Sequence, residues 1–182
     1  MNRVLIVVDY QNDFVTGSLG FPGAEALAGP IVERIQSYRK NGDDIIFTVD
    51  THDEDYMETQ EGRKLPVPHC IRETEGWYLH DKVAAASKDK DEFFCKATFP
   101  SLELGNWLEE CDYGQVELCG LVSHICVLSN AVIAKAALPE AEIVVDASLT
   151  ASNDPVMHEK ALDILEGLQV TVLNRYKIID KR

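Results

Sequence analysis

The feature that most limits the possible folds is a series of short apolar segments without alternation of polar and apolar residues. A strand whose two faces are both apolar is typical of a parallel sheet that is covered by helices on both sides. The six predicted strands are residues 4–8, 44–50, 92–96, 116–121, 142–147 and 169–173.

Segments of helical length separate most of these strands. The first has Pro30 near its start and Gly42 at its end, and the last is capped by Asp154. The alternation predicts a three-layer, doubly wound α/β sandwich, in which a central, mostly parallel sheet of about six strands carries helices on both faces. We expect a single domain over residues 1–182. The predicted helices are residues 31–42, 102–110, 124–138 and 155–168.

The net charge of −14 disfavours nucleic acid as a partner, because an acidic surface repels phosphate. The five cysteines include no C-x-x-C pair, so neither a disulfide framework nor a zinc ribbon is expected. The N-terminal apolar run is too short for a signal peptide, and no segment reaches the length of a membrane span. These observations predict a cytoplasmic protein that has no membrane partner.

In a parallel sheet of this type, ligands bind beyond the carboxyl ends of the strands. Asp9 follows the first predicted strand. Asp50 is the last residue of the second, and His52 lies just after it. Lys96 is the last residue of the third. Cys126 follows the fourth strand, in the segment GLVSHICV. An acid, a lysine, a thiol and a pair of metal-ligand types should therefore meet at one edge of the sheet.

Cys126 has two possible roles. A lone cysteine is most often a small buried apolar residue. However, Cys126 lies in the first turn of a predicted helix, where unpaired N–H groups stabilise a thiolate. Asp9 could accept the thiol proton or could cap a turn, and Lys96 could hold the Asp9 charge or lie on the surface. The shared position of the three residues favours a nucleophilic site.

The long polar segment of residues 51–76 supplies further candidates for metal binding. In D-T-H at residues 50–52, Asp50 and His52 lie on the same face of an extended chain, and the segment adds Glu61 and His69. Carboxylates and imidazoles suit Zn²⁺, Mn²⁺ or Fe²⁺. The D-x-H spacing alone is a weak signal, and the pattern does not select one ion.

Five motifs in this order resemble the isochorismatase-like cysteine hydrolases, and within them the nicotinamidases. The resemblance extends over nearly the whole chain. The motifs are VVDYQNDF (7–14), VDTHDEDY (49–56), EGRKLPVPHC (61–70), CKATFPS (95–101) and GLVSHICV (120–127).

The resemblance implies that Asp9, Lys96 and Cys126 form a catalytic triad. It also implies a cis peptide bond between Leu121 and Val122, with the backbone N–H groups of Val122 and Cys126 forming an oxyanion hole. The implied reaction is hydrolysis of a small-molecule amide through a thioester on Cys126, which converts nicotinamide and water to nicotinate and ammonia. Members of the family often assemble as homo-oligomers, which we expect here as well.

The resemblance also assigns a cofactor and a pocket. Asp50, His52 and His69 match the ligands of one divalent ion, Zn, Mn or Fe, and Glu61 matches a fourth ligand of some members. The residues expected to line the substrate pocket are Phe14, Leu121 and Tyr56.

Two positions depart from the family pattern. Ser123 and His124 stand where the family often has a threonine followed by an acid, and Pro66 replaces an aromatic residue.

Alternative functions are hydrolysis of a carbamoyl or ureido compound, isochorismatase activity, a bare redox role for the cysteine, and ligand binding without catalysis. The complete catalytic triad and the complete set of metal-ligand residues favour the interpretation as a nicotinamidase.

Overall fold

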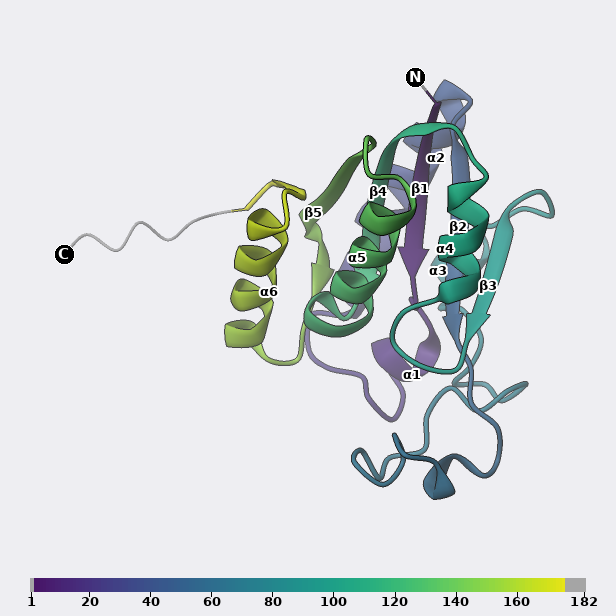
Figure 1. Cartoon of the computed structure of the whole chain (residues 1–182). Coiled ribbons are helices and arrows are strands. Elements are labelled where there is room, and N and C mark those ends of the chain that lie inside the picture. Colours follow the sequence, from purple (N-terminus) through teal and green to yellow (C-terminus); the bar gives the residue numbers. More distant parts are fainter. Residues whose placement is uncertain (1, 176–182) are drawn as a thin grey trace.

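The computed structural model describes residues 2–175, and its framework is one six-stranded sheet (Figure 1). Its order is β3-β2-β1-β4-β5-β6, and all neighbouring strands are parallel. The predicted α/β sheet of about six strands is thus confirmed. The strands are β1 (Asn2–Val8), β2 (Asp44–Asp50), β3 (Glu92–Lys96), β4 (Tyr113–Leu121), β5 (Glu142–Ala151) and β6 (Thr171–Leu173).

The chain builds this sheet outward from its centre in two directions. From β1 it adds β2 and β3 on one side, and it then returns to add β4, β5 and β6 on the other. The direction of growth therefore reverses between β1 and β4, which opens a crevice at their carboxyl ends. The polar segment of residues 51–80 lies beyond the same ends of the strands (Figure 1).

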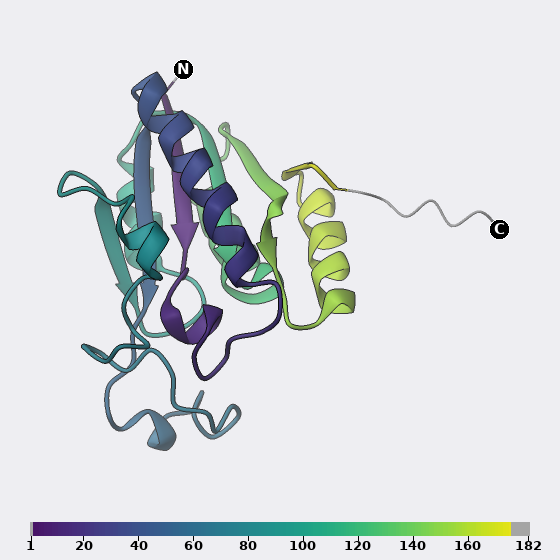
Figure 2. The same ribbon diagram turned by 180° about the vertical axis from the view of Figure 1, so that it is seen from behind.

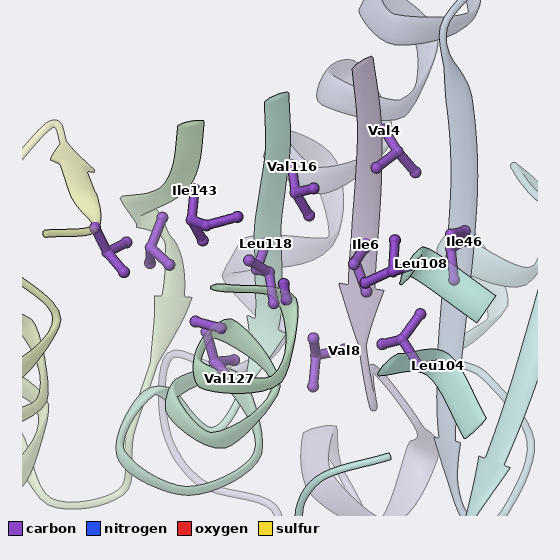
Figure 3. Packing of buried hydrophobic residues seen from close by; sticks show 14 of the residues in the cluster. Val4, Ile6, Val8, Ile46, Leu104, Leu108, Val116, Leu118, Val127 and Ile143 are labelled. Atoms are coloured by element: carbon purple, nitrogen blue, oxygen red, sulfur yellow. The ribbon is translucent and has the colours of Figure 1, made fainter. Parts of the chain in front are cut away.

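Three helices cover one face of the sheet: α4 (Leu102–Glu109), α5 (Leu128–Ala137) and α6 (Pro155–Gly167). Figure 3 shows part of this layer, in which Leu104 of α4 and Val127 belong to one buried cluster with Ile6, Val8 and Leu118 of the strands. Burial of each such side chain contributes about 1.5–3 kcal/mol. This layer therefore holds the start of α5 firmly against the centre of the sheet.

The opposite face carries α1 (Asn12–Val15), α2 (Ala28–Asn41) and α3 (Asp81–Ala84) (Figure 2). Ile31, Ile35 and Tyr38 of α2 recur at helical spacing and are buried in one cluster with Leu5 and Val7 of β1. Helices therefore lie on both faces, as the sequence predicts. Within residues 2–175, none of the helices combines the length and the apolar character that crossing a bilayer requires.

The layer under α2 also contains buried charges. Glu117 of β4 and Asp146 of β5 are almost completely inaccessible to solvent. Arg34 of α2 reaches both, with nitrogen–oxygen distances of 2.5 Å to Glu117 and 2.7 Å to Asp146. Tyr38 donates a further hydrogen bond to Glu117. A single arginine is therefore the shared partner of two buried carboxylates, which would be costly to bury without one.

Several element boundaries differ from those predicted. The helix expected from residue 31 begins at Ala28, because a proline is tolerated in a first turn, where its missing N–H has no helical acceptor. The helix expected over 124–138 is a π-helical turn, η3 (Ser123–Val127), followed by α5. The last strand is shorter because Gln169 has a φ of +65°, which interrupts extended backbone. Two short 3₁₀ turns, η1 (Glu25–Leu27) and η2 (Tyr56–Glu58), complete the element list.

Candidate active site

Asp9 stands at the centre of the site, immediately after β1. Its φ of +45° is rare for a residue other than glycine and turns the chain sharply at the end of the strand. The carboxylate is fully buried. Thr48 of β2 donates a hydrogen bond of 2.6 Å to its Oδ1, while its Oδ2 lies 2.6 Å from Nζ of Lys96. Asp9 is therefore held by its neighbours as a buried, partnered carboxylate.

Lys96 connects the charged groups of the site. It ends β3, and the strand register pairs it with Asp50 at the end of β2. Its Nζ lies 2.6 Å from Asp9, 3.1 Å from Oδ1 of Asp50 and 3.6 Å from Sγ of Cys126. The ammonium group also donates a hydrogen bond to the carbonyl of Thr98. The structure thus brings Asp9, Lys96 and Cys126 together, and Lys96 contacts both of the others.

Cys126 lies in η3, directly beyond the end of β4. The peptide bond between Leu121 and Val122 is cis, as the resemblance implies. Just before it, Gly120 has a φ of +107°, and a Cβ atom there would lie 2.1 Å from the carbonyl oxygen of Val8. Only glycine allows β4 to approach β1 so closely at this point. This close approach places Cys126 beside the residues that follow β1.

Burial sets the direction of the pKa shift for Asp9 and Cys126, whereas neighbouring charges set it for Lys96. Burial raises the pKa of Asp9 above its usual value, against the opposing charge of Lys96. Burial likewise raises the pKa of Cys126 well above that of a free thiol, again against Lys96. Burial alone would lower the pKa of Lys96, but Asp9, Cys126 and Asp50 raise it well above its ordinary value. Cys126 is therefore a thiol at neutral pH, and Asp9 is a stronger base than a free aspartate.

Asp50, His52 and His69 form the candidate metal group. One potential ligand atom of each lies within 4.8 Å of the others, and all three residues are buried. Nε2 of His52 lies 3.2 Å from Oδ2 of Asp50, and Nε2 of His69 lies 3.5 Å from the same oxygen. Burial alone would raise the pKa of Asp50, but Lys96 and the two histidines hold it below its usual range. Asp50 is thus a carboxylate, as a metal ligand must be.

The protonation of His69 supports the assignment of a cation site. Its Nδ1 lies 2.8 Å from the carbonyl of Val67, which can only accept, so Nδ1 carries a proton. In the neutral ring, Nε2 then presents a lone pair to Oδ2 of Asp50. Two acceptors that face each other require a proton or a cation beside them. The ligand types and this tautomer suit a divalent ion such as Zn²⁺.

Glu61 lies near this group, but its carboxylate is farther from the two histidines than that of Asp50 is. Its Oε1 lies 3.7 Å from Nε2 of His52 and 4.0 Å from Nε2 of His69. Its side chain is 15% exposed, against 3–5% for the two histidines. Glu61 also lines the neighbouring cavity. A role as fourth ligand stays a prediction.

A cavity of about 220 Å³ joins the nucleophile to the metal candidates. Phe14 lines it as expected, and so do Val122 and Cys126. His124, one of the positions that depart from the family pattern, also lines it. Five further lining residues were not predicted from the sequence: Leu19, Leu65, Phe99, Ile125 and Asn153.

Two residues expected in the pocket lie behind its wall instead. Leu121 is fully buried in the cluster under α2. Tyr56 is 1% exposed, and its ring centroid lies 4.7 Å from that of His52 and 5.0 Å from that of His69. Its hydroxyl donates to the carbonyl of Leu65. Tyr56 therefore supports the two imidazoles and is absent from the cavity lining.

Sequence reasoning also missed residues that hold the site in place. Asn130 of α5 is fully buried, donates to the carbonyls of Phe99 and Cys126, and accepts from the N–H of Ser101. It joins the turn that carries Cys126 to the segment after β3. The available signal was a single asparagine in a nearly apolar helix, where a buried amide requires several partners.

Comparisons with known proteins agree with this geometry. A model of the isochorismatase domain matches residues 3–175. An isochorismatase family protein of Bacillus subtilis is 33% identical over 144 residues, which are 72% of this chain and 78% of that protein. The crystal structure of a nicotinamidase/pyrazinamidase from Bacillus subtilis has a TM-score of 0.84 and 32% identity, and covers 95% of this chain and 100% of that one. The structure of a pyrazinamidase/nicotinamidase from Streptococcus mutans UA159 gives 0.83 and 29%, covering 94% and 100%.

Proposed function

Because the chain belongs to the isochorismatase family, we propose that it is a metal-containing cysteine amidohydrolase that converts nicotinamide and water to nicotinate and ammonia. One observation carries the proposal. Lys96 contacts both Asp9 and Cys126, and Cys126 opens into a cavity that Asp50 and His69 also line. The relatives named nicotinamidase/pyrazinamidase support the substrate class.

In the proposed reaction, Sγ of Cys126 attacks the amide carbon while Asp9 accepts the thiol proton. Asp9 then gives this proton to the leaving nitrogen, ammonia departs, and a thioester remains on Cys126. Water attacks the thioester with Asp9 again accepting a proton, which releases the carboxylic acid and restores the thiol. Lys96 keeps its charge throughout and stabilises the thiolate character that develops on Sγ as Asp9 takes the thiol proton.

The tetrahedral intermediate needs donors for its oxyanion. We assign this role to the backbone N–H groups of Val122 and Cys126, both of which line the cavity. Phe14, also in the lining, offers an aromatic surface to the substrate ring.

The residues that would hold a divalent ion are Asp50, His52 and His69, with Glu61 as a fourth ligand. An ion bound there supplies a Lewis acid that can hold the ring nitrogen of the substrate or a water next to it. The three closest ligands include one carboxylate and two imidazoles, which Zn²⁺, Mn²⁺ and Fe²⁺ all accept. A single domain over residues 1–182, a cytoplasmic location and a homo-oligomeric assembly stay predictions.

Ammonia release from nicotinamide tests the proposed function. Purified protein is assayed as isolated, after treatment with a chelator, and as the Cys126→Ala variant. We expect ammonia from the untreated protein only, with recovery when Zn²⁺, Mn²⁺ or Fe²⁺ is returned to the chelated sample. A folded, metal-loaded protein that releases no ammonia would exclude nicotinamide, and a panel of carbamoyl and ureido compounds would then identify the amide that is cleaved.

A further inference from the structure

The metal candidates lie between two cavities. The cavity beside Cys126, which we call the inner cavity, is lined by Asp50 and His69. A second cavity of about 280 Å³ is lined by His52, and Glu61 lines both. We call the second one the outer cavity, and its lining also includes Asp53, Asp55, Thr59, Ala97 and Thr98. The buried metal group therefore has a cavity on each of two sides.

The two cavities differ in the chemistry of their linings. The inner cavity is largely apolar, with Phe14, Leu19 and Phe99 in its wall. The outer cavity is lined by three acidic residues and three threonines, and among the described residues neither a lysine nor an arginine lines it. An apolar surface accommodates a hydrated divalent cation poorly, whereas oxygen atoms can replace its waters. The outer cavity therefore suits a cation, and the inner cavity suits the amide.

The carboxylates of the outer cavity keep their charge available. Within residues 2–175, no ion pair involves Asp55, and the one that involves Asp53 is weak. Nε of Arg72 lies 3.4 Å from Oδ1 of Asp53, and both side chains are exposed. Carboxylates that line a cleft raise the local concentration of counter-ions and the rate at which they arrive. These side chains can therefore attract a cation to the outer cavity.

His52 connects the outer cavity to the buried group. Its side chain is 5% exposed, and its Nε2 lies 3.2 Å from Oδ2 of Asp50. Its Nδ1 has no hydrogen-bond partner in the described part of the chain, yet it is not one of the polar atoms that lack both a partner and contact with solvent. Because His52 lines the outer cavity and not the inner one, this unpartnered nitrogen opens to the outer cavity. A single imidazole thus separates the outer cavity from the metal group.

We propose that the outer cavity binds an incoming hydrated divalent cation and is the path by which this ion reaches Asp50, His52 and His69. The inference rests on the metal site of the proposed function. It assigns the two cavities to different ligands, since the inner cavity receives the amide. An ion can then enter or leave while an amide or a thioester occupies the inner cavity.

Removal of the outer carboxylates tests this path. Metal-free protein is mixed rapidly with Co²⁺, whose visible absorption gives the association rate, and transfer to a chelator gives the dissociation rate. In Asp53→Asn/Asp55→Asn we expect association to slow by at least about fivefold at low ionic strength. The difference should nearly disappear at about 1 M salt, where charges act over only about 3 Å.

Glu54→Gln is the matched control for this measurement. Glu54 lies between the two aspartates in the sequence, but it does not line the outer cavity. Its loss removes a charge from the same segment and should slow association by less than about twofold. Equal slowing per removed charge in Glu54→Gln and in Asp53→Asn/Asp55→Asn would overturn the inference, because general attraction by the acidic segment would then set the rate.

A second pair of variants distinguishes the cavities by steric block. Ala97→Trp narrows the outer cavity, and Leu65→Trp narrows the inner one. Because an obstructed path slows entry and exit equally, we expect both Co²⁺ rates to fall by the same factor in Ala97→Trp, about fivefold or more, with an unchanged Kd. Leu65→Trp should keep the wild-type rates. Slowing in Leu65→Trp that equals or exceeds the slowing in Ala97→Trp would overturn the inference.

The results separate this inference from the proposed function. Ammonia from nicotinamide, with equal Co²⁺ association in wild type and Asp53→Asn/Asp55→Asn, would overturn the path and leave the proposed function intact. Slower association in that variant, with no ammonia from the wild type, would support the path and exclude nicotinamide. A wild-type protein that gives no Co²⁺ absorption band would overturn both the metal site and its path.

Discussion

Gln11 and Asp50 are joined by two hydrogen bonds between the side-chain amide of Gln11 and the backbone of Asp50. Oε1 of Gln11 accepts from the Asp50 N–H at 2.8 Å, and Nε2 donates to the Asp50 carbonyl at 2.8 Å. The same Nε2 donates to the carbonyl of Trp77 at 2.7 Å. Gln11 therefore fixes the backbone of a candidate metal ligand and ties it to the long polar loop.

Replacing Gln11 with Met should weaken metal binding more than it weakens the fold. Met has a similar length but cannot pair with the two backbone groups of Asp50, so the carboxylate loses its fixed position. Loss of an outer partner of a metal ligand typically costs about 10–100-fold in affinity. We expect a loss of this size in the Kd for Co²⁺, measured from its visible absorption.

Gln36→Met on the exposed face of α2 is the matched control and should keep the wild-type Kd. Thermal unfolding of both metal-free variants shows whether the fold is intact. An unchanged Kd in folded Gln11→Met would mean that Asp50 holds its position without the amide.

Replacing Arg34 with Leu should strongly destabilise the protein. The change leaves the buried carboxylates of Glu117 and Asp146 without their shared cation. Removing one partner of a buried ion pair costs about 3–5 kcal/mol. The free energy of unfolding in urea should fall by this amount. Lys40→Leu, at an exposed site on the same helix, should change it by less than about 0.5 kcal/mol.

Stability should decrease as the pH falls below neutrality, in part because of His158. Burial lowers the pKa of His158, with Arg175 lowering it further and Glu159 opposing. The unfolded chain, with a histidine pKa of about 6.5, thus takes up its proton at a higher pH than the folded chain does. Stability is lost as the pH drops through 6.5 toward the lower folded value.

The His158→Gln variant should have a smaller slope of unfolding free energy against pH between about 7.5 and 5.5. His124, whose pKa is also lowered by burial, contributes in the same direction. The double variant with His124→Gln should therefore be flatter still. Equal slopes in wild type and both variants would contradict this origin of the pH dependence.

The layers of the fold could be predicted from the sequence because the strands are apolar on both faces. In β1, for example, Val4 and Val8 are buried on one face of the sheet and Leu5 and Val7 on the other, so the continuous apolar run of the sequence corresponds to a strand that is covered on both faces. The boundaries of helices and strands were less predictable where they depend on local backbone geometry and not on residue composition. The turn at Ser123–Val127 is π-helical, although its sequence, SHICV, is equally compatible with a regular helix.

The site was predictable where topology alone brings residues together. Asp9, Lys96 and Cys126 come from the ends of three strands, and the parallel sheet places those ends at one edge. The pocket wall was less predictable, because Tyr56 and His69 come from a loop whose path depends on many separate hydrogen bonds. Asp13, for example, fixes the backbone of Cys70 through a bond of 2.7 Å. A tyrosine close in sequence to a metal-binding histidine can line the substrate cavity or pack behind the histidine. Both arrangements have the same sequence pattern.

The reactivity of Cys126 should depend on the charge of Lys96. Lys96 is the group that lowers the pKa of Cys126 against burial and the negative charge of Asp9. In Lys96→Met the pKa of the thiol therefore rises further, and its thiolate fraction at pH 8 falls. Since only the thiolate reacts with iodoacetamide, we expect alkylation at Cys126 to slow by at least about tenfold.

Cys95 is an internal control for this measurement, because it is exposed and lies one residue from the substituted position. Its alkylation, followed by site-resolved mass spectrometry in the same sample, should keep its wild-type rate. Lys96→Arg retains a positive charge and should react at a rate between those of the wild type and Lys96→Met. Faster alkylation of Cys126 in folded Lys96→Met would mean that Lys96 shields the thiol more than it promotes ionisation, and that the thiolate is stabilised chiefly by the backbone of η3.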